Sequence, residues 1–160
     1  VYTDAPGTNW RAGGWSASSS TQSSAYQGSA ALAVRYTGAW GGFMFERNGA
    51  SGPIPFGATE YKTLTFAVNA GSSVSSNLNS LVVHLDNGST SKPLVNYLPG
   101  AKWVANKWQV VQIPLADLNS KNATYYRLVI QSGAQATGFG FALASKHRKI
   151  IPRPTHRPLP

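Results

Sequence analysis

The stretch Leu81-Val82-Val83-His84-Leu85-Asp86-Asn87-Gly88 decides the fold class. Leu81, Val83 and Leu85 alternate with Val82, His84 and Asp86, and this period of two is typical of a half-buried β-strand. Asn87-Gly88 is a common dipeptide in the tight turn that follows such a strand. The stretch therefore predicts a strand with one buried face, followed by a turn.

The same period of two recurs on both sides of this stretch, over the first 145 residues. Clear alternation occurs in three further apolar sets, which are Leu32, Val34 and Tyr36; Leu64, Phe66 and Val68; and Phe139, Phe141 and Leu143. Short strands are also expected at residues 43–46, 94–98, 110–113 and 126–130. Roughly eight or nine short strands at regular spacing predict an all-β protein, specifically a β-sandwich of the jelly-roll type.

The segments between the strands contain turn and loop residues. Residues 38–42 form a glycine-rich turn, and the Ser-rich segments 16–24 and 71–79 are expected to be loops. A single helical turn is expected at residues 115–118. After Ser145 prolines alternate with basic residues, and little remains to pack. The sequence therefore predicts a β-sandwich domain over residues 1–145 and a basic, Pro-rich tail or linker over residues 146–160.

The composition agrees with a folded extracellular domain. Of the 160 residues, 42% are hydrophobic and only 12% are charged, about half of the usual share of charged residues. A surface made of Ser, Thr, Asn, Gln and Gly is common in extracellular β-proteins, so we expect a secreted protein. The chain has no cysteine, which excludes disulfides and thiolate chemistry. No apolar run reaches the ~18–20 residues of a membrane span.

The net charge of +9 is concentrated at one end of the chain. Residues 146–160 contain five basic residues and no acid, and such a tail attracts polyanions or improves solubility. The basic residues of the body form no nucleic-acid-binding motif, so nucleic acid is not an expected partner. The positive charge makes an acidic glycan somewhat more attractive as a ligand than a neutral one.

The sequence offers few residues for catalysis. A glycoside hydrolase usually needs two carboxylates across one cleft. The chain has only five acids, which are Asp4, Glu46, Glu60, Asp86 and Asp117. Asp117 follows Pro114 and is interpreted as a capping or turn residue. No zinc-protease, nucleophile-elbow or phosphate-loop motif occurs, so we expect no catalytic residues. One enzymatic alternative stays open, a jelly-roll polysaccharide lyase that uses Arg127, His84 and a tyrosine.

Aromatic residues are the strongest functional signal, with five tryptophans and seven tyrosines. The apolar faces of sugar rings stack on indole and phenol rings, while amide, guanidinium and imidazole groups bind the hydroxyls. Trp103, Tyr97 and Trp40 lie in turn-rich segments and are the predicted stacking residues. Trp108 directly precedes an alternating strand and is interpreted as structural. Trp10 and Trp15 are expected to cover an end of the sandwich.

Four polar residues on the predicted strands are offset from the apolar positions, which are Arg35, His84, Arg127 and Gln131. Side chains at such positions point away from the core. If their strands belong to one sheet, these residues line the same open face. Arg35, His84 and Gln131 are the predicted polar partners of the glycan.

Several segments resemble those of secreted carbohydrate-binding-module-like domains. They are Val1-Tyr2-Thr3-Asp4-Ala5, Trp10, Gly14-Trp15-Ser16, Gly28-Ser29-Ala30-Ala31-Leu32-Ala33-Val34, Gly38-Ala39-Trp40-Gly41-Gly42, Tyr61-Lys62-Thr63-Leu64-Thr65-Phe66 and Lys107-Trp108-Gln109-Val110-Val111-Gln112-Ile113-Pro114-Leu115. The resemblance covers roughly residues 1–143. It implies a jelly-roll sandwich of the kind usually appended to carbohydrate-active or cell-surface proteins. It also implies a ligand on a concave sheet face or along the loops.

A structural calcium ion is frequent in such domains. Asp4, together with nearby backbone carbonyls, is the expected contributor to an oxygen-rich calcium site. The closing strand of these domains commonly carries a pair of aspartates that helps to hold the ion. Here the corresponding residues 139–145 contain no acid.

These observations predict a noncatalytic, secreted module that binds an acidic or neutral polysaccharide, as a monomer and as part of a larger multidomain protein. The main alternative is a structural or protein-interaction domain whose aromatics all lie in the core. In that alternative, the Pro-rich tail binds the partner in an extended form. The lyase is the second alternative.

Overall fold

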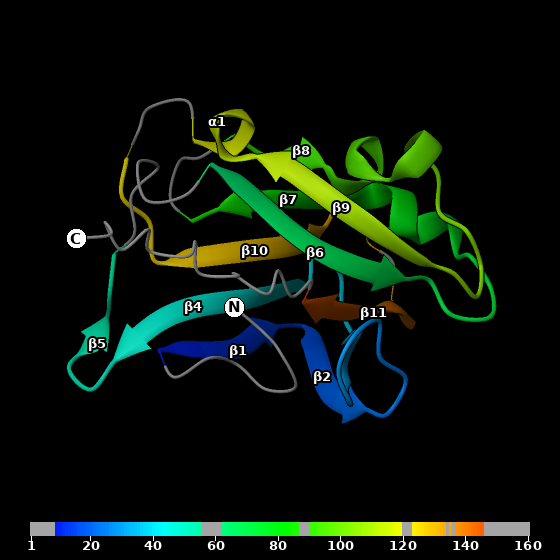
Figure 1. Ribbon diagram of the computed structural model, residues 1–160, viewed down its shortest axis with the longest axis horizontal. Helices are drawn as coiled ribbons and strands as arrows, with labels where there is room; N and C mark the ends of the chain where they lie inside the picture. The colour runs from blue at the N-terminus through cyan, green and yellow to red at the C-terminus, as the bar shows by residue number, and fades with distance from the viewer. Residues whose placement is uncertain are drawn as a thin grey trace, which may run out of the picture.

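Two antiparallel β-sheets pack face to face in the computed structural model of the chain (Figure 1). The structure describes residues 9–55, 62–86, 90–119, 123–133, 135 and 137–145. Within these ranges, nine strands have five to eight residues and two further strands have two residues each. The fold is an all-β sandwich, which confirms the predicted fold class.

The first sheet has six strands in the order β1-β4-β10-β7-β8, with β5 paired to the end of β4. Their bounds are β1 Trp10–Trp15, β4 Gly42–Gly49, β5 Gly52–Pro53, β7 Leu81–Leu85, β8 Lys92–Pro93 and β10 Arg127–Ser132. Apart from the consecutive strands β7 and β8, neighbours in this order are far apart in sequence, as in a jelly roll. The arrangement therefore depends on long-range pairing.

The second sheet has five strands in the order β2-β3-β11-β6-β9. Their bounds are β2 Ala17–Gln22, β3 Ala31–Tyr36, β6 Thr63–Asn69, β9 Trp108–Pro114 and β11 Phe139–Ser145. The last strand of the fold, β11, lies at the centre of this sheet between β3 and β6. The outer face of this sheet carries an open groove.

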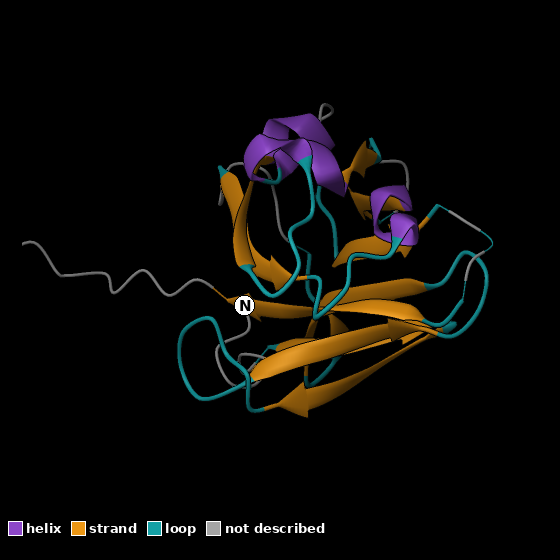
Figure 2. Ribbon diagram, turned by 90° about the vertical axis from the view of Figure 1, so that its right-hand side faces the viewer, coloured by secondary structure: helices purple, strands orange, loops and turns teal. Residues whose placement is uncertain are grey.

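Short helical turns lie on one side of the strands (Figure 2). They are η1 Ser76–Ser80, η2 Leu94–Tyr97, η3 Pro99–Ala101 and α1 Leu115–Leu118. The single α-helical turn confirms the one expected at residues 115–118. Among the described elements, no helix is long and apolar enough to cross a membrane.

Alternate side chains of the strands fill the space between the sheets. Tyr36 is fully buried, and its ring stacks on Phe139 with 4.9 Å between the ring centroids. Its hydroxyl donates a hydrogen bond of 2.9 Å to the carbonyl oxygen of Ile130 on β10. Because β3 and β10 belong to different sheets, this bond ties the two layers together. Burial raises the pKa of Tyr36 above its ordinary range, so the hydroxyl stays protonated as a donor.

Most predicted strands are confirmed. Residues 10–15, where no strand was expected, form β1, and η1 begins inside the loop expected at residues 71–79. Two further segments also differ from the prediction. Residues 94–98, expected as a strand, form η2, because Leu94 and Leu98 are buried while Asn96 between them is exposed. That is a period of four, which suits a helical turn. Residues 16–24, expected as a loop, contain β2, which pairs with β3 and keeps most of its side chains exposed. The strand is held by main-chain hydrogen bonds to β3 and buries few side chains, so its sequence shows no apolar alternation.

We predict that Tyr36→Phe lowers the free energy of unfolding by about 1 kcal/mol, the usual net contribution of a buried hydrogen bond. The substitution keeps the ring that stacks on Phe139 and removes only the inter-sheet bond to Ile130. Urea unfolding measures the difference. Tyr126→Phe is the matched control, since Tyr126 is 39% exposed and should change stability little. Equal stability of Tyr36→Phe and the parent would show that the bond contributes nothing.

Candidate functional site

An open groove of about 760 Å³ lies on the outer face of the five-stranded sheet. Its floor consists of small residues of the two central strands, which are Ala33 on β3 and Gly140 and Ala142 on β11. Gly140 is required there, because a β-carbon at this position would come within 2.0 Å of the Val34 carbonyl oxygen. The floor is therefore nearly smooth backbone.

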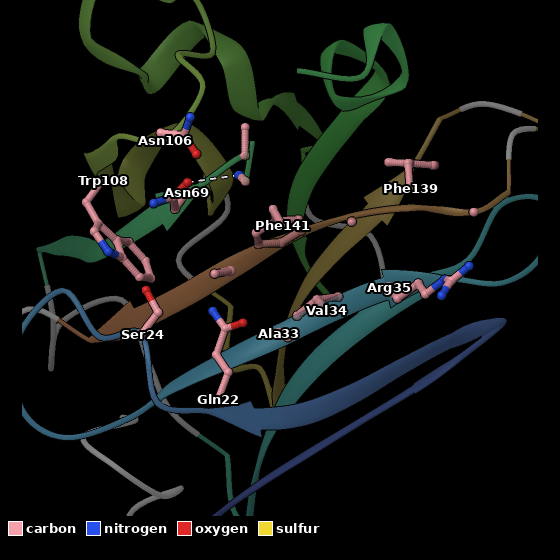
Figure 3. A pocket seen from close by; sticks show the side chains of 15 residues that line it. Gln22, Ser24, Ala33, Val34, Arg35, Asn69, Asn106, Trp108, Phe139 and Phe141 are labelled. Atoms are coloured by element: carbon pink, nitrogen blue, oxygen red, sulfur yellow. Dashed lines mark hydrogen bonds between the residues drawn. The ribbon is translucent and has the colours of Figure 1, made fainter. Parts of the chain in front are cut away.

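Larger side chains border this floor. Trp108, Asn69 and Asn106 lie at one end of the groove and Arg35 lies at the other (Figure 3). The strand register explains the placement, because Ala33, Ala142, Asn69 and Trp108 stand side by side across β3, β11, β6 and β9. Four strands carry this row, so its width is about 14 Å at the usual strand spacing.

The connection between β2 and β3 closes one end of the groove. Tyr26 in this connection lies 6.0 Å from Trp108, measured between ring centroids, although β3 and β9 are separated by two strands. Ala31, Ala67 and Ala144 also point outward from the sheet, yet each is at most 1% exposed. A segment that crosses from β3 to β9 accounts for this burial, and small alanines leave room for it. Trp108 is thus held in place by Tyr26.

The groove offers an indole, several carboxamides and one guanidinium group. The Oδ1 atom of Asn69 accepts a hydrogen bond of 2.9 Å from the Gly71 amide, which orients the Asn69 side chain at the groove wall. The main-chain amide of Asn106 donates a hydrogen bond of 2.7 Å to the Gly71 carbonyl oxygen, which holds Asn106 at the groove. Among the described lining residues, Arg35 is the one charged side chain and none is a carboxylate. Such a surface suits an uncharged, hydroxyl-rich ligand with apolar faces.

The predicted polar residues do not share one face. Arg35 lies at the groove on the five-stranded sheet, whereas His84 and Gln131 lie on β7 and β10 of the six-stranded sheet. Their side chains point away from the core, as expected, but from the opposite layer of the sandwich. The condition that these strands belong to one sheet is therefore not met.

Trp103 is not a surface residue, so the prediction that it offers a stacking platform is wrong. It is 6% exposed and packs in the core, with its ring centroid 6.1 Å from that of Phe141. Gln109 folds the loop back over the sandwich. Its side chain accepts a hydrogen bond from the Val104 amide and donates one to the Lys102 carbonyl, each of 2.8 Å.

Tyr97 is partly buried and is occupied by a structural contact. Its hydroxyl donates a hydrogen bond of 2.9 Å to Oδ2 of Asp117, which joins η2 to α1. Burial, together with the bond to Asp117 and its negative charge, raises the pKa of Tyr97 to about 12. The ring borders a separate shallow hollow of about 520 Å³, beside Val110 and Gln112 of β9. The structure does not bring it together with Arg35 or Trp40.

Trp40 is exposed, as predicted for a turn residue, but it lies away from the groove. Its side chain is 50% exposed, in the connection from β3 to β4. The Trp40 carbonyl accepts hydrogen bonds from Nε1 of Trp15 and from Nε2 of Gln131, of 2.9 and 3.2 Å. Two of the predicted residues, Trp40 and Gln131, therefore do come together.

The described carboxylates are engaged in structural contacts. Glu46 is 1% exposed and forms ion pairs with Arg11 and Arg127. Burial alone would raise the pKa of Glu46, but the hydrogen bonds and positive charges of both arginines hold it below its ordinary value. Asp86 accepts hydrogen bonds from the amides of Tyr126 and Arg127, of 3.1 and 3.3 Å. No pair of acids faces the groove in the part of the chain that the structure describes.

The calcium prediction remains a prediction. Asp4 lies outside the described residues, as do Glu60 and the tail at residues 146–160. Within the described ranges, no three His, Asp or Glu side chains gather as metal ligands would.

Trp108, interpreted from the sequence as structural, also borders the groove. The side chains of Val111 and Ile113 are buried, so those of Trp108, Val110 and Gln112 point to the opposite side of β9. The sequence does not show which alternate positions of β9 are buried, because the adjacent residues Val110 and Val111 are both apolar and either could face the core. No sequence pattern marks the other polar residues of the groove, which are Asn69, Asn106 and Gln22.

Comparison with known proteins supports the fold. The sequence matches no protein-family model and no curated protein. Among solved structures, a β-1,2-glucanase from Parabacteroides distasonis is similar with a TM-score of 0.56 and 17% identity, over 86% of this chain and 22% of that chain. A mutant of a family 29 carbohydrate-binding module is similar with a TM-score of 0.52 and 13% identity, over 91% of this chain and 86% of that one.

The chain has the fold of a carbohydrate-binding module. The resemblance expected from the sequence is thus confirmed at the level of the sandwich. Identities of 13–17% support a shared fold and give no information about the ligand. The chain spans about a fifth of the glucanase.

We predict that Glu46→Gln lowers stability at pH 7 and that the difference shrinks in acid. The folded pKa of Glu46 lies below its ordinary value of 4.5, so the ionised group stabilises the fold above that pH. This contribution is lost as the pH falls through the folded pKa. Urea unfolding at pH 7 and pH 3 measures the effect. Tyr126→Phe, which removes no charge, should show no such pH dependence. A difference of equal size at both pH values would contradict the prediction.

Proposed function

We propose that this protein binds a polysaccharide in the groove of the five-stranded sheet and is not an enzyme. The observation that carries the proposal is the indole of Trp108, partly exposed beside a floor made of Ala33, Gly140 and Ala142. A sugar ring laid on this floor meets backbone rather than bulky side chains. Its apolar face can then pack against the indole, while carboxamides reach its hydroxyls.

The structural likeness is consistent with this proposal. The family 29 relative is described as a module whose mechanism of ligand recognition was probed by mutation. That protein and this one share the sandwich, and this chain covers 86% of it. A polysaccharide ligand is in turn consistent with the composition of a secreted protein, so we also propose an extracellular location.

The charge of the groove favours a neutral glycan over an acidic one. Arg35 is the one cation among the described lining residues, and five of the basic residues behind the net charge of +9 lie in the tail. An acidic polymer carries a negative charge on each charged sugar unit, and a single cation in the described lining compensates little of that charge. Stacking and neutral hydrogen bonds are also little affected by salt, so we propose binding that persists at high ionic strength.

The lyase alternative lacks support from the described geometry. Arg127 forms an ion pair of 3.2 Å with Glu46, and the Nδ1 atom of His84 lies 2.9 Å from the Leu85 carbonyl oxygen. Both residues belong to the six-stranded sheet, away from the groove. The proposed function is therefore noncatalytic.

Affinity electrophoresis tests the proposal against mixed-linkage β-glucan, β-1,2-glucan, mannan and xylan, with pectate and alginate as acidic polymers. We predict that at least one neutral polymer retards the full chain. Trp108→Ala should weaken that binding roughly 30-fold, corresponding to about 2 kcal/mol for truncation of a stacking aromatic. Ala142→Leu should also weaken it, because the larger side chain fills the floor without removing a contact group.

Two controls make this experiment decisive. Tyr126→Ala removes an exposed aromatic outside the groove and should bind as the parent does. Replacing the five basic residues of the tail, Lys146, Arg148, Lys149, Arg153 and Arg157, with glutamine should leave the retardation unchanged. Retardation that disappears with these charges would reject the groove and favour an interaction through the tail. Retardation that survives both groove substitutions would reject the groove and place binding on another surface.

A further inference from the structure

Two exposed tryptophans form a pair on the other sheet of the sandwich. Trp15 is 44% exposed and Trp40 is 50% exposed, the two highest values among the large apolar side chains that the structure describes as exposed. Trp15 is the last residue of β1 and pairs with Gly42 of β4. On its other side, Gly42 pairs with Gln131 of β10. These residues point outward, since Phe43 next to Gly42 is buried in the core. The tryptophan pair is thus separate from the groove.

The indole of Trp15 lies flat on the sheet. A β-carbon added to Gly42 would come within 2.3 Å of Cη2 and Cζ2 of Trp15, so the ring rests directly over the backbone of β4. Only glycine allows this approach. One face of the ring is therefore covered by the sheet, and the other faces outward.

Hydrogen bonds fix both residues in place. Nε1 of Trp15 donates to the Trp40 carbonyl oxygen at 2.9 Å, and Nε2 of Gln131 donates to the same oxygen at 3.2 Å. Trp40 has a φ of 56°, a left-handed conformation that is costly for a residue with a side chain. Neighbouring contacts must offset this cost, and unusual backbone of this kind is concentrated at functional sites. The pair is therefore organised before any ligand binds.

We propose that Trp15, Trp40 and Gln131 form a second carbohydrate-binding site, which takes a neutral sugar ring stacked on the Trp15 indole. A carboxamide has two donor hydrogens and an acceptor oxygen, and the contact with Trp40 uses one hydrogen. Gln131 is partly exposed and is positioned to bind a ring hydroxyl. The site shares only the ligand class of the proposed function and does not require the groove to bind.

The size of the exposed surface favours a sugar over a protein partner. At about 250 Å² for a tryptophan side chain, the two indoles expose about 240 Å² together. A stable protein interface needs about 800 Å² on each partner, whereas a single sugar ring covers an area similar to one indole. The outward row Trp15, Gly42, Gln131, Val82 and Pro93 carries no charge. An acidic ligand therefore meets no counter-charge in this row.

A titration followed by NMR tests the two sites separately in the full chain. The probes are soluble gluco-oligosaccharides with β-1,4, mixed β-1,3-1,4 and β-1,2 linkages, and β-1,4 manno- and xylo-oligosaccharides. The indole N–H signals of Trp15 and Trp40 report the second site, and that of Trp108 reports the groove. We expect saturable shifts of the Trp15 and Trp40 signals in both the parent and Trp108→Ala.

Two variants test the geometry of the stacking surface. Gly42→Ala should displace the Trp15 ring from the sheet and abolish its saturable shift while the Trp108 response stays. Trp15→Ala should abolish the saturable shift of the Trp40 signal while the Trp108 response stays. Tyr126→Ala is the matched control, because Tyr126 is also exposed, at 39%, and should bind as the parent does.

The outcomes distinguish this inference from the proposed function. Shifts at Trp108 with none at Trp15 or Trp40 would overturn the second site and leave the groove intact. Shifts at Trp15 and Trp40 with none at Trp108 would support the second site and reject the groove. A Trp15 response that persists unchanged in Gly42→Ala would overturn the proposed stacking on this indole.

Discussion

The common core of the two sheets is the constraint on which both candidate sites depend. Leu32, Val34 and Tyr36 of β3 are at most 6% exposed, and burying them leaves the strand one orientation. Because successive side chains point to opposite faces, that orientation places Ala33 and Arg35 on the outer face. On β4 the buried Phe43 places Gly42 outward in the same way. The outer surfaces are thus decided by what the interior needs to bury.

The small residues of the outer faces are not all explained by that interior. Gly140 is required by the close approach of β11 to the Val34 carbonyl oxygen. Ala33 and Ala142 meet no such constraint, and exposed positions on an outer face usually carry larger polar side chains. Gly42 is needed only because the Trp15 ring lies over it. Both surfaces therefore combine an indole with bare backbone, an arrangement that admits a flat ligand.

The fold was predictable from sequence to a much greater extent than the site. Alternation at Leu32, Val34 and Tyr36 defined both a strand and its phase, so Arg35 was placed correctly on an outer face. The sequence does not reveal which strands share a sheet, and Arg35 therefore lies on a different layer from His84. Trp103, the predicted stacking residue, is buried, whereas Trp108 borders the groove. The burial of Trp103 depends on the hydrogen bonds of Gln109 across a loop, which no local pattern predicts.

The distribution of charge favours binding over catalysis. The described carboxylates hold the fold, with Glu46 between two arginines, Asp86 on the backbone of β10 and Asp117 on η2. None of them is free to move a proton in the groove. What remains there is stacking and neutral hydrogen bonding, each modest in strength. Because the groove and the tryptophan pair lie on opposite sheets, two separate polysaccharide chains can occupy them more easily than one.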